Sequence, residues 1–223
     1  MRIEVLIILA SNSPRRKWLF EKLGLNFKIQ PADVDEENYT DEHPGEYVIR
    51  TANQKAHWIS NLIEEPAIII AADTTVAIGN RILGKPMNVK EAVQMLQELR
   101  GKTHQVYTGL SVIRVPELIT RNDLCVTEVP IRYFSDDEMM AYIATGDPFD
   151  KAGAYAIQHH GFHPVEDLAG CFANVVGLPM CHLARTLSDF GISIKNDIPQ
   201  ICKVVFKYEC PIYKQYLDFV NEQ

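Results

Sequence analysis

The sequence has no long hydrophobic segment, no closely spaced pair of cysteines and no run of basic residues. The apolar run over residues 3–10 is too short to cross a bilayer, is interrupted by Glu4 and lacks a signal-peptide cleavage site. The five cysteines contain no C-x-x-C pair, which argues against a disulfide framework or a zinc site and favours a reducing compartment. The formal net charge of −7 argues against binding along a nucleic-acid backbone. We therefore expect a cytoplasmic protein that has neither a membrane nor a nucleic acid as its partner.

Several familiar catalytic motifs are also missing. The G-x-x-x-x-G-K spacing of a Walker phosphate loop is absent, and so is the G-x-S-x-G of a serine-hydrolase elbow. His159, His160 and His163 match no standard zinc spacing, and we interpret them as structural or solvated residues. No internal repeat, low-complexity tract or flexible linker divides the chain. The chemistry must therefore be sought in other residues of a globular protein.

What the sequence does contain is an alternation of β-rich runs and amphipathic helices, typical of an α/β protein. The runs predict strands over residues 3–10, 27–30, 67–72, 104–115, 124–134 and 171–176, with a hairpin turn at Gly79-Asn80. Helical spacing and capping residues predict helices beginning near Ser13, Pro44, Asn88, Ser135 and Pro179, and a last one around 211–221. We expect a mixed, largely buried sheet flanked by helices. Residues 1–190 would form the main domain, and residues 191–223 an extension packed on it.

The turn SNSPRR, residues 11–16, leads from the first strand into a helix. Ser13 fits the N-cap and Pro14 the first helical position, so free backbone N–H groups and the positive end of the helix dipole face a ligand there. The serine hydroxyls and the guanidinium groups of Arg15 and Arg16 add donors suited to phosphate oxygens. The segment predicts a phosphate site, although capping alone also explains Ser13 and Pro14.

Two carboxylates form a second candidate group. Asp73 follows directly on the buried run AIIIAA, so we place it at a strand end, where open α/β sheets bind ligands. Glu36 follows the second strand within the acidic segment 33–37. Carboxylates on two strand ends can hold one divalent cation while substrate phosphates complete its coordination. The alternatives are a turn residue for Asp73 and a solvated acidic run for Glu36.

Two further polar residues are expected in loops. Lys85 lies between Gly84 and Pro86, so its loop is fixed and its point charge could meet a phosphate. Gln158 ends a segment of small residues, and its amide offers one donor and one acceptor to a base edge. Taken alone, each also fits an ordinary role, as an exposed loop lysine and a packed polar residue.

These segments, in this order, resemble the Maf family of nucleotide pyrophosphatases. The resemblance covers roughly residues 5–190. It is carried by LASNSPRR at 9–16, DVDEE at 33–37, AADTTV at 71–76, LGKP at 83–86, GKTHQVYTGL at 101–110, DKAGAYAIQ at 150–158 and NVVGLP at 174–179. Any one of these segments is a weak signal, whereas the whole series in register is specific.

The resemblance implies a two-lobed α/β fold, a homodimer, and a cleft that binds a nucleoside triphosphate and Mg²⁺ or Mn²⁺. By that likeness, Asp73 is the proton acceptor and, with Glu36, a metal ligand. The residues that would hold the substrate are Ser11, Arg15, Arg16, Thr74, Lys85 and Gln158. The implied reaction is attack of water on the α-phosphorus with release of pyrophosphate. Because an ordinary aspartate has a pKa of about 3.9, we expect a weak base that depends on the metal.

Arg15, Thr74 and Gln158 match the family members that prefer dTTP and UTP, so the resemblance implies that subtype. The chain departs from the family pattern at Gly84, at His159-His160-Gly161 and in the extension 191–223. Two other functions stay open. One is hydrolysis of a modified nucleotide, and the other is a nucleotide-sensing regulator of cell division that binds without turnover.

Overall fold

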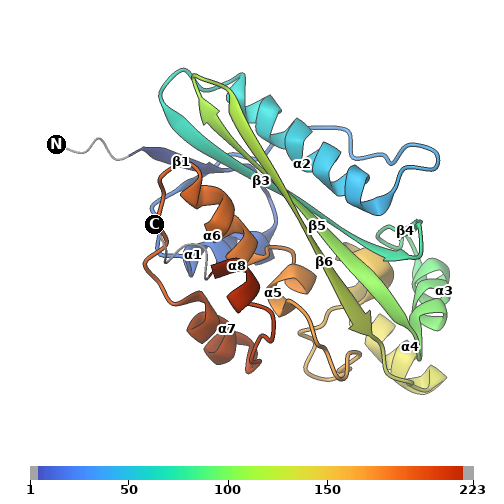
Figure 1. Ribbon diagram of the computed structural model, residues 1–223. Coiled ribbons are helices and arrows are strands. Elements are labelled where there is room, and N and C mark those ends of the chain that lie inside the picture. Colours follow the sequence, from blue (N-terminus) through green and yellow to red (C-terminus); the bar gives the residue numbers. More distant parts are fainter. Residues whose placement is uncertain (1–4, 218–223) are drawn as a thin grey trace.

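The computed structural model describes residues 5–217, which form a six-stranded sheet with helices on both faces (Figure 1). The strands are β1 (Leu6–Leu9), β2 (Lys28–Ile29), β3 (Ala67–Ile78), β4 (Arg81–Leu83), β5 (Thr103–Val115) and β6 (Ile119–Pro130). Their order is β2-β1-β3-β5-β6, with β4 paired to β3. β1 runs parallel to β2 and β3, whereas the other pairs are antiparallel. The predicted mixed α/β fold is confirmed.

Helix α2 (Pro44–Ser60) covers one face of the long strands β3 and β5. Side chains alternate between the two faces of a strand. On this face, the odd-numbered residues 67–71 of β3 pack with Ala56 and Ile59 of α2. A side chain at Gly109 of β5 would collide with the backbone of Val48 in α2, so glycine lets the helix approach the sheet closely. This packing fixes the inner face of α2 against the strands.

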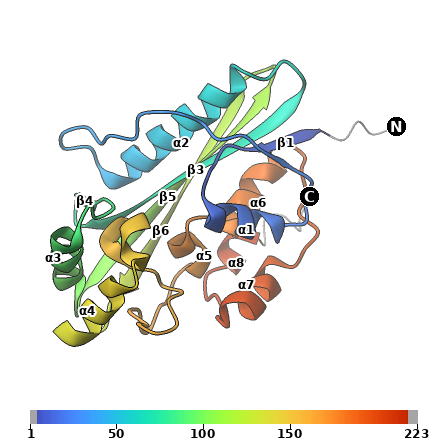
Figure 2. The same cartoon turned by 180° about the vertical axis from the view of Figure 1, so that it is seen from behind.

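The opposite face of the sheet carries two lobes (Figures 1 and 2). One contains α1 (Pro14–Glu21), α5 (Phe172–Val176), α6 (Met180–Ser188) and α7 (Ile198–Phe206), packed on the even-numbered residues 68–72 of β3. The other contains α3 (Val89–Leu99), α4 (Asp136–Ala144) and the 3₁₀ helices η1 (Asp147–Asp150) and η2 (Ala152–Ala154), packed around Val76. Each lobe has its own hydrophobic cluster. The two-lobed architecture is therefore confirmed, and the boundary on β3 falls at Thr74.

Three of the predicted helix starts are confirmed together with their capping contacts. Ser13 Oγ accepts a hydrogen bond from the N–H of Arg16 at 3.3 Å, and Asn88 caps α3. Ser135 and Glu138 form a capping box at the start of α4. Local capping chemistry therefore sets these boundaries independently of the tertiary packing.

The segment 171–176, predicted as a strand, is the helix α5, so that prediction is wrong. Cys171 caps it, and Gly177 ends it with a φ of 113°, a conformation that glycine adopts without strain. The side chain of Asn174 donates to the Val106 carbonyl oxygen and to Thr127 Oγ1, which ties the helix to β5 and β6. Side-chain bonds to the sheet have overridden the β propensity of this short run.

The C-terminal segment covers α1, α5 and α6. Its helix α7, which the sequence analysis does not predict, places Phe206 against Trp18 and Phe172, with ring centroids 6.0 and 4.5 Å apart. The helix expected around 211–221 is α8 (Lys214–Leu217), and residues 218–221 lie outside the described part. The division of the chain at residue 190 stays a prediction.

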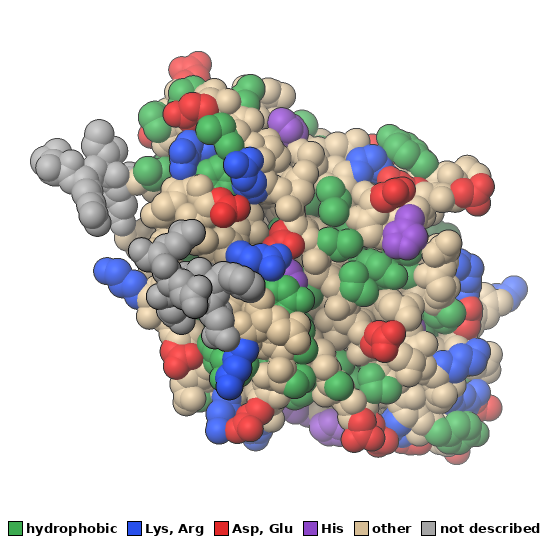
Figure 3. Space-filling view, in the orientation of Figure 1, with side chains coloured by type: hydrophobic (Ala, Val, Ile, Leu, Met, Phe, Trp, Pro, Cys, Tyr) green, Lys and Arg blue, Asp and Glu red, His purple; other side chains and the backbone are tan. Residues whose placement is uncertain are grey.

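The surface carries charges of both signs. On the face seen in Figure 3, lysine and arginine side chains are interspersed with acidic ones. Within residues 5–217, no helix combines the length and apolarity needed to cross a membrane. The cysteines are all free thiols, four of them buried.

Candidate active site

The sheet has a gap along one edge of β3. On this edge β1 pairs with residues 67–70 and β4 with residues 76–78, so no strand in the described part of the chain pairs with residues 71–75 there. A cavity of about 440 Å³ opens at the gap, and the loop after β1 lines its opposite wall. Because the edge is open, the cavity reaches side chains on both faces of β3.

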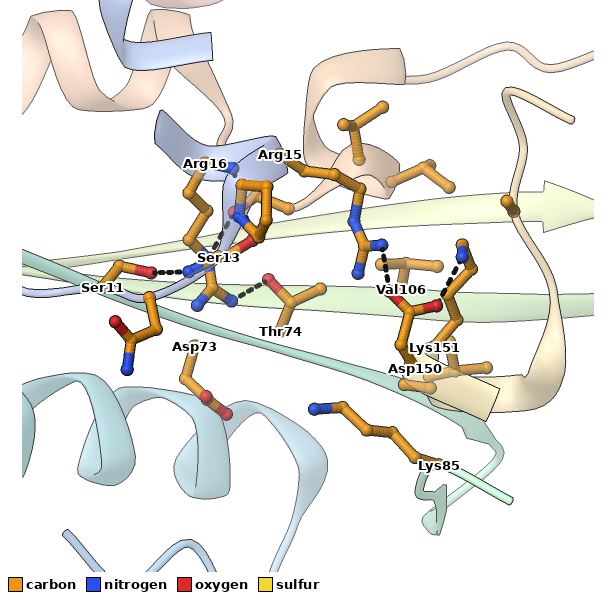
Figure 4. A pocket seen from close by; sticks show the side chains of 18 of the residues that line it. Ser11, Ser13, Arg15, Arg16, Asp73, Thr74, Lys85, Val106, Asp150 and Lys151 are labelled. Carbon is orange, nitrogen blue, oxygen red and sulfur yellow. Dashed lines mark hydrogen bonds and ion pairs between the residues drawn. The ribbon is translucent and has the colours of Figure 1, made fainter. Parts of the chain in front are cut away.

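Asp73 lies within β3, which corrects its predicted place at a strand end. The strand continues because β5 pairs with it through this position, where Asp73 stands opposite Gly109. The carboxylate lines the cavity because no neighbouring strand among the described residues covers this edge, and its own strand does not end there. Thr74, the next residue, points to the other face of β3, so the two side chains flank the strand (Figure 4).

Asp73 forms an ionic cluster with Lys55 of α2 and Glu36, which we call the floor cluster. Lys55 Nζ lies 2.7 Å from Asp73 Oδ1 and 2.8 Å from Glu36 Oε1. Asp73 is only 5% exposed and Lys55 only 7%, whereas the Glu36 side chain is half-exposed. One buried ammonium group therefore compensates two carboxylates at the bottom of the cavity.

Burial raises the pKa of Asp73 above its ordinary value, while the positive charges of Lys55 and Arg16 act in the opposite direction. The pKa of this aspartate therefore lies above the ordinary value from which the sequence analysis starts. A general base is most effective when its pKa approaches the working pH. Burial thus makes the carboxylate more basic than an exposed aspartate, while Lys55 keeps a positive charge beside its ionised form.

Lys55 is the residue of the candidate site that the sequence analysis misses. The apolar face of α2 is marked by Ala52, Ala56 and Ile59, and Lys55 lies on that same face. A buried ammonium group without a counter-charge is costly, so a lysine there requires an acidic partner. The helical periodicity was the signal that could have indicated it.

The turn before α1 supplies the wall that faces β3. Ser11 Oγ accepts a hydrogen bond from the N–H of Ser13 at 3.2 Å, and Ser13 caps the helix, so both hydroxyl groups stabilise the turn. Arg16 reaches across the cavity, where Nη2 donates to Thr74 Oγ1 at 3.0 Å and Nε to the Gly177 carbonyl at 2.9 Å. These contacts hold one guanidinium group in a fixed orientation beside the gap.

Arg15 extends toward the second lobe. Its Nη1 lies 3.1 Å from Asp150 Oδ2, and Asp150 also pairs with Lys151. Lys151 Nζ in turn lies 2.9 Å from Asp147 Oδ1. We call these four residues the mouth chain, of which Figure 4 labels Arg15, Asp150 and Lys151. Its outer pair is far more exposed than Lys55 and Asp73 of the floor cluster, with exposed fractions of 36% for the Arg15 side chain and 66% for that of Asp150.

Lys85 and Gln158 line the cavity from the second lobe. Lys85 forms no ion pair with any residue that the structure describes, and Figure 4 shows its ammonium group directed toward the side where Asp73 lies. Gln158 also lines an adjoining cavity of about 470 Å³, together with His159 and His160. The second lobe therefore contributes one unpaired cation and one amide to the site.

All the residues predicted for the site lie around one cavity: Ser11, Arg15, Arg16, Glu36, Asp73, Thr74, Lys85 and Gln158. Their individual roles stay predictions. No group of three or more metal-ligating side chains occurs within residues 5–217. Asp73 and Glu36 nevertheless fit Mg²⁺ or Mn²⁺, because such ions are commonly held by one or two carboxylates together with substrate phosphates. Each of the two contacts Lys55 closely through one oxygen, and its second oxygen remains for a cation.

The sequence of this chain is similar to those of several known proteins. The family model described as "Maf-like protein" matches residues 6–190. A dTTP/UTP pyrophosphatase of Desulforamulus reducens is 44% identical over 191 residues, which are 84% of this chain and 98% of the relative. A dTTP/UTP pyrophosphatase of Caldanaerobacter subterraneus subsp. tengcongensis is 45% identical over 187 residues, or 83% and 90% of the two chains. A solved HAM1 protein from Coxiella burnetii superposes with a TM-score of 0.46 at 12% identity, covering 98% of this chain and all of the other.

Proposed function

This chain belongs to the Maf family, and on that premise we propose that it hydrolyses nucleoside triphosphates, preferring dTTP and UTP, to a monophosphate and pyrophosphate. The relatives that bear the name dTTP/UTP pyrophosphatase are aligned over more than four-fifths of the chain. The observation that carries the proposal is the floor cluster, in which a buried carboxylate and a buried ammonium group face a cavity that Ser11, Arg16 and Lys85 also line.

The cations around the cavity suit a triphosphate. Arg16 is fixed beside the start of α1, and Lys85 approaches from the other lobe without a counter-ion of its own within residues 5–217. Preorganised cations stabilise the charge that gathers on departing phosphate oxygens, which is the main strategy of phosphoryl-transfer enzymes. In this proposal Arg16 and Lys85 hold the leaving pyrophosphate.

Asp73 accepts the proton of the attacking water. Its raised pKa makes it a better base than an exposed aspartate, and Lys55 stabilises the carboxylate before the proton arrives. Glu36, on the far side of Lys55, adds a second negative charge at the same place. A divalent cation bound by Asp73 and Glu36 would supply neutralisation of phosphate charge and a more acidic water.

Substrate turnover tests the proposal directly. The purified protein is incubated with Mg²⁺ or Mn²⁺ and a panel of canonical and modified triphosphates, and the products are separated by chromatography. We expect monophosphate and pyrophosphate, formed fastest from dTTP and UTP. Asp73→Asn should lower kcat by about 100- to 10,000-fold, the range for loss of a general base, while nucleotide binding persists.

Other outcomes would redirect the assignment. Fastest turnover of a modified nucleotide would keep the reaction and overturn the preference for dTTP and UTP. Tight binding of a nucleotide without any hydrolysis would favour the regulator. Near-normal turnover by Asp73→Asn would remove Asp73 from its role as the base.

A further inference from the structure

The mouth chain connects two parts of the site that lie far apart in the sequence. Arg15 belongs to α1 in the first lobe, and Gln158 follows η2 in the second. The pair Arg15–Asp150 is the one ion pair, among residues 5–217, that joins α1 to the segment 147–158. The geometry of Arg15 relative to Gln158 therefore depends on what holds Asp150.

Asp150 is held by a continuous series of contacts. Lys151 bonds to Asp150 and to Asp147. The Tyr142 hydroxyl donates to Asp147 Oδ2 at 2.9 Å and accepts from the N–H of Ala156 at 3.0 Å. Ala156 is two residues before Gln158 and lines the same cavity. The contacts that orient Arg15 and the backbone that leads to Gln158 are thus parts of one network.

Arg15 relies on Asp150 for its orientation. In the described part of the chain its guanidinium group bonds to Asp150 through Nη1, which leaves Nε and Nη2 for a ligand. The side chain lines both the main cavity and the adjoining one, so it stands at their junction. An arginine without such an anchor has many rotamers, and ordering it on binding costs entropy.

We propose that Asp150 is a positioning residue for nucleotide specificity. It holds Arg15 at the junction of the two cavities, where the free nitrogens of Arg15 and the amide of Gln158 meet the same nucleobase. This inference rests on the proposed function and names a residue that acts on base preference through Arg15. In this inference Asp150 does not contact the reacting phosphates. Its loss therefore weakens nucleotide binding and base discrimination, but leaves the turnover rate at saturating substrate unchanged.

The charge of Asp150 is constant around neutral pH. Burial acts to raise the pKa of its carboxyl group, but Lys151 and Arg15 outweigh burial, so the pKa lies below its ordinary value. The anchor therefore stays ionised from about pH 6 to about pH 8, well above the ordinary aspartate range. The effect of replacing Asp150 should be the same at both ends of that interval.

The test is a double-mutant cycle of Asp150→Ala and Arg15→Ala. Asp150→Ala should raise KM for dTTP and UTP by about two- to five-fold, the range for an exposed ion pair, with kcat within about two-fold. The preference of this variant for dTTP over dCTP, measured as the ratio of the two kcat/KM values, should fall. Because Asp150 acts through Arg15, the double variant should match Arg15→Ala alone. Asp150→Glu, which keeps the carboxylate, should recover most of the preference.

The matched control is Asp136→Ala, which removes another exposed Arg–Asp pair, formed with Arg100 at 2.7 Å outside the cavity. It should leave KM and base preference unchanged.

Additive effects of the two single variants, or a loss confined to kcat, would overturn the inference. Calorimetric titration with a non-hydrolysable dTTP analogue reads the same cycle without turnover. A wild-type protein that binds the analogue but hydrolyses nothing would therefore refute the proposed function and leave the cycle readable, whereas absence of binding would refute both.

Discussion

The floor cluster and the mouth chain are two groups of charges in one cavity, and they differ in almost every physical respect. At the floor, Lys55 and Asp73 are nearly inaccessible to water, and a single ammonium group compensates two carboxylates. At the mouth, Arg15 and Asp150 meet the solvent and are linked to further charges. Coulomb interactions are strong in a poorly solvated interior and weak at a hydrated surface. Replacing a charged residue should therefore affect stability much more at the floor than at the mouth.

The difference in burial assigns the two groups different tasks. A buried ion pair is costly to assemble and very costly to break, so its presence suggests a chemical need for those charges. An exposed pair contributes little stability, and its value lies in orienting a side chain. We infer that the floor cluster serves the reaction and the mouth chain serves recognition. The following predictions test this contrast.

The largest effect is expected for Lys55→Met. The change leaves the buried carboxylate of Asp73 without its direct partner, and breaking a buried pair in this way costs about 3–5 kcal/mol. Chemical denaturation with a fluorescence readout should show this loss in the free energy of unfolding. The exposed pair Lys17–Glu21 provides a control, since Lys17→Met should cost less than about 0.5 kcal/mol.

The double variant Lys55→Met, Asp73→Asn separates charge from packing. If the penalty arises from an uncompensated carboxylate, neutralising Asp73 should recover stability relative to Lys55→Met alone. If Lys55→Met unfolds at nearly the wild-type denaturant concentration, the floor cluster does not have the energetic role assigned to it.

Much of this arrangement could be predicted from the sequence, because it is encoded locally. The caps at Ser13, Asn88 and Ser135 are short-range patterns, and they fixed the start of three helices. The residues of the site were also predictable, since their motifs resemble those of a known family. Each of these residues lines the main cavity.

The predictions that were wrong concern features that depend on contacts between residues far apart in the sequence. No local pattern shows that β3 continues through Asp73, because this follows from its pairing with β5, which begins some thirty residues later. The helix α5 is predicted as a strand because a short, mostly apolar run fits either structure, and the contacts of Asn174 with Val106 and Thr127 decide between them. Lys55 was overlooked because its partners come from other elements of the fold.

An intermediate effect on stability is expected for His104, a buried ionisable group that forms no ion pair with any residue of the described part of the chain. Its Nε2 lies 2.9 Å from the hydroxyl of Tyr155, which lines the cavity, and Nδ1 has no partner in the described residues. Burial lowers the pKa of His104 to about 4. The unfolded chain, with a histidine pKa of about 6.5, binds the proton first as the pH falls. The stability that the neutral histidine contributes is therefore complete above about pH 6.5 and declines as the pH falls toward 4.

His104→Gln should make this acid dependence weaker. Between pH 7 and pH 5 the free energy of unfolding of the wild type should fall by about 1–2 kcal/mol more than that of the variant, as linkage predicts for one such histidine. Buried His182, whose pKa is also lowered to about 4, allows the same comparison at a site away from the cavity. Parallel pH curves for wild type and His104→Gln would mean that the pKa of His104 is the same in the folded and the unfolded protein, so that burial does not lower it.

The smallest effect on stability is expected at the mouth. Asp150→Ala should change the free energy of unfolding by less than about 1 kcal/mol, because the pair with Arg15 is exposed. The coupling free energy between Arg15 and Asp150, measured in a double-mutant cycle, should also decrease when NaCl is raised to about 0.5 M. The coupling free energy between Lys55 and Asp73 should hardly change, because salt screens exposed charges more than buried ones. Denaturation curves at the two salt concentrations measure both couplings. A mouth pair as costly to break as the floor pair, or one equally insensitive to salt, would mean that burial is not what separates the two groups of charges.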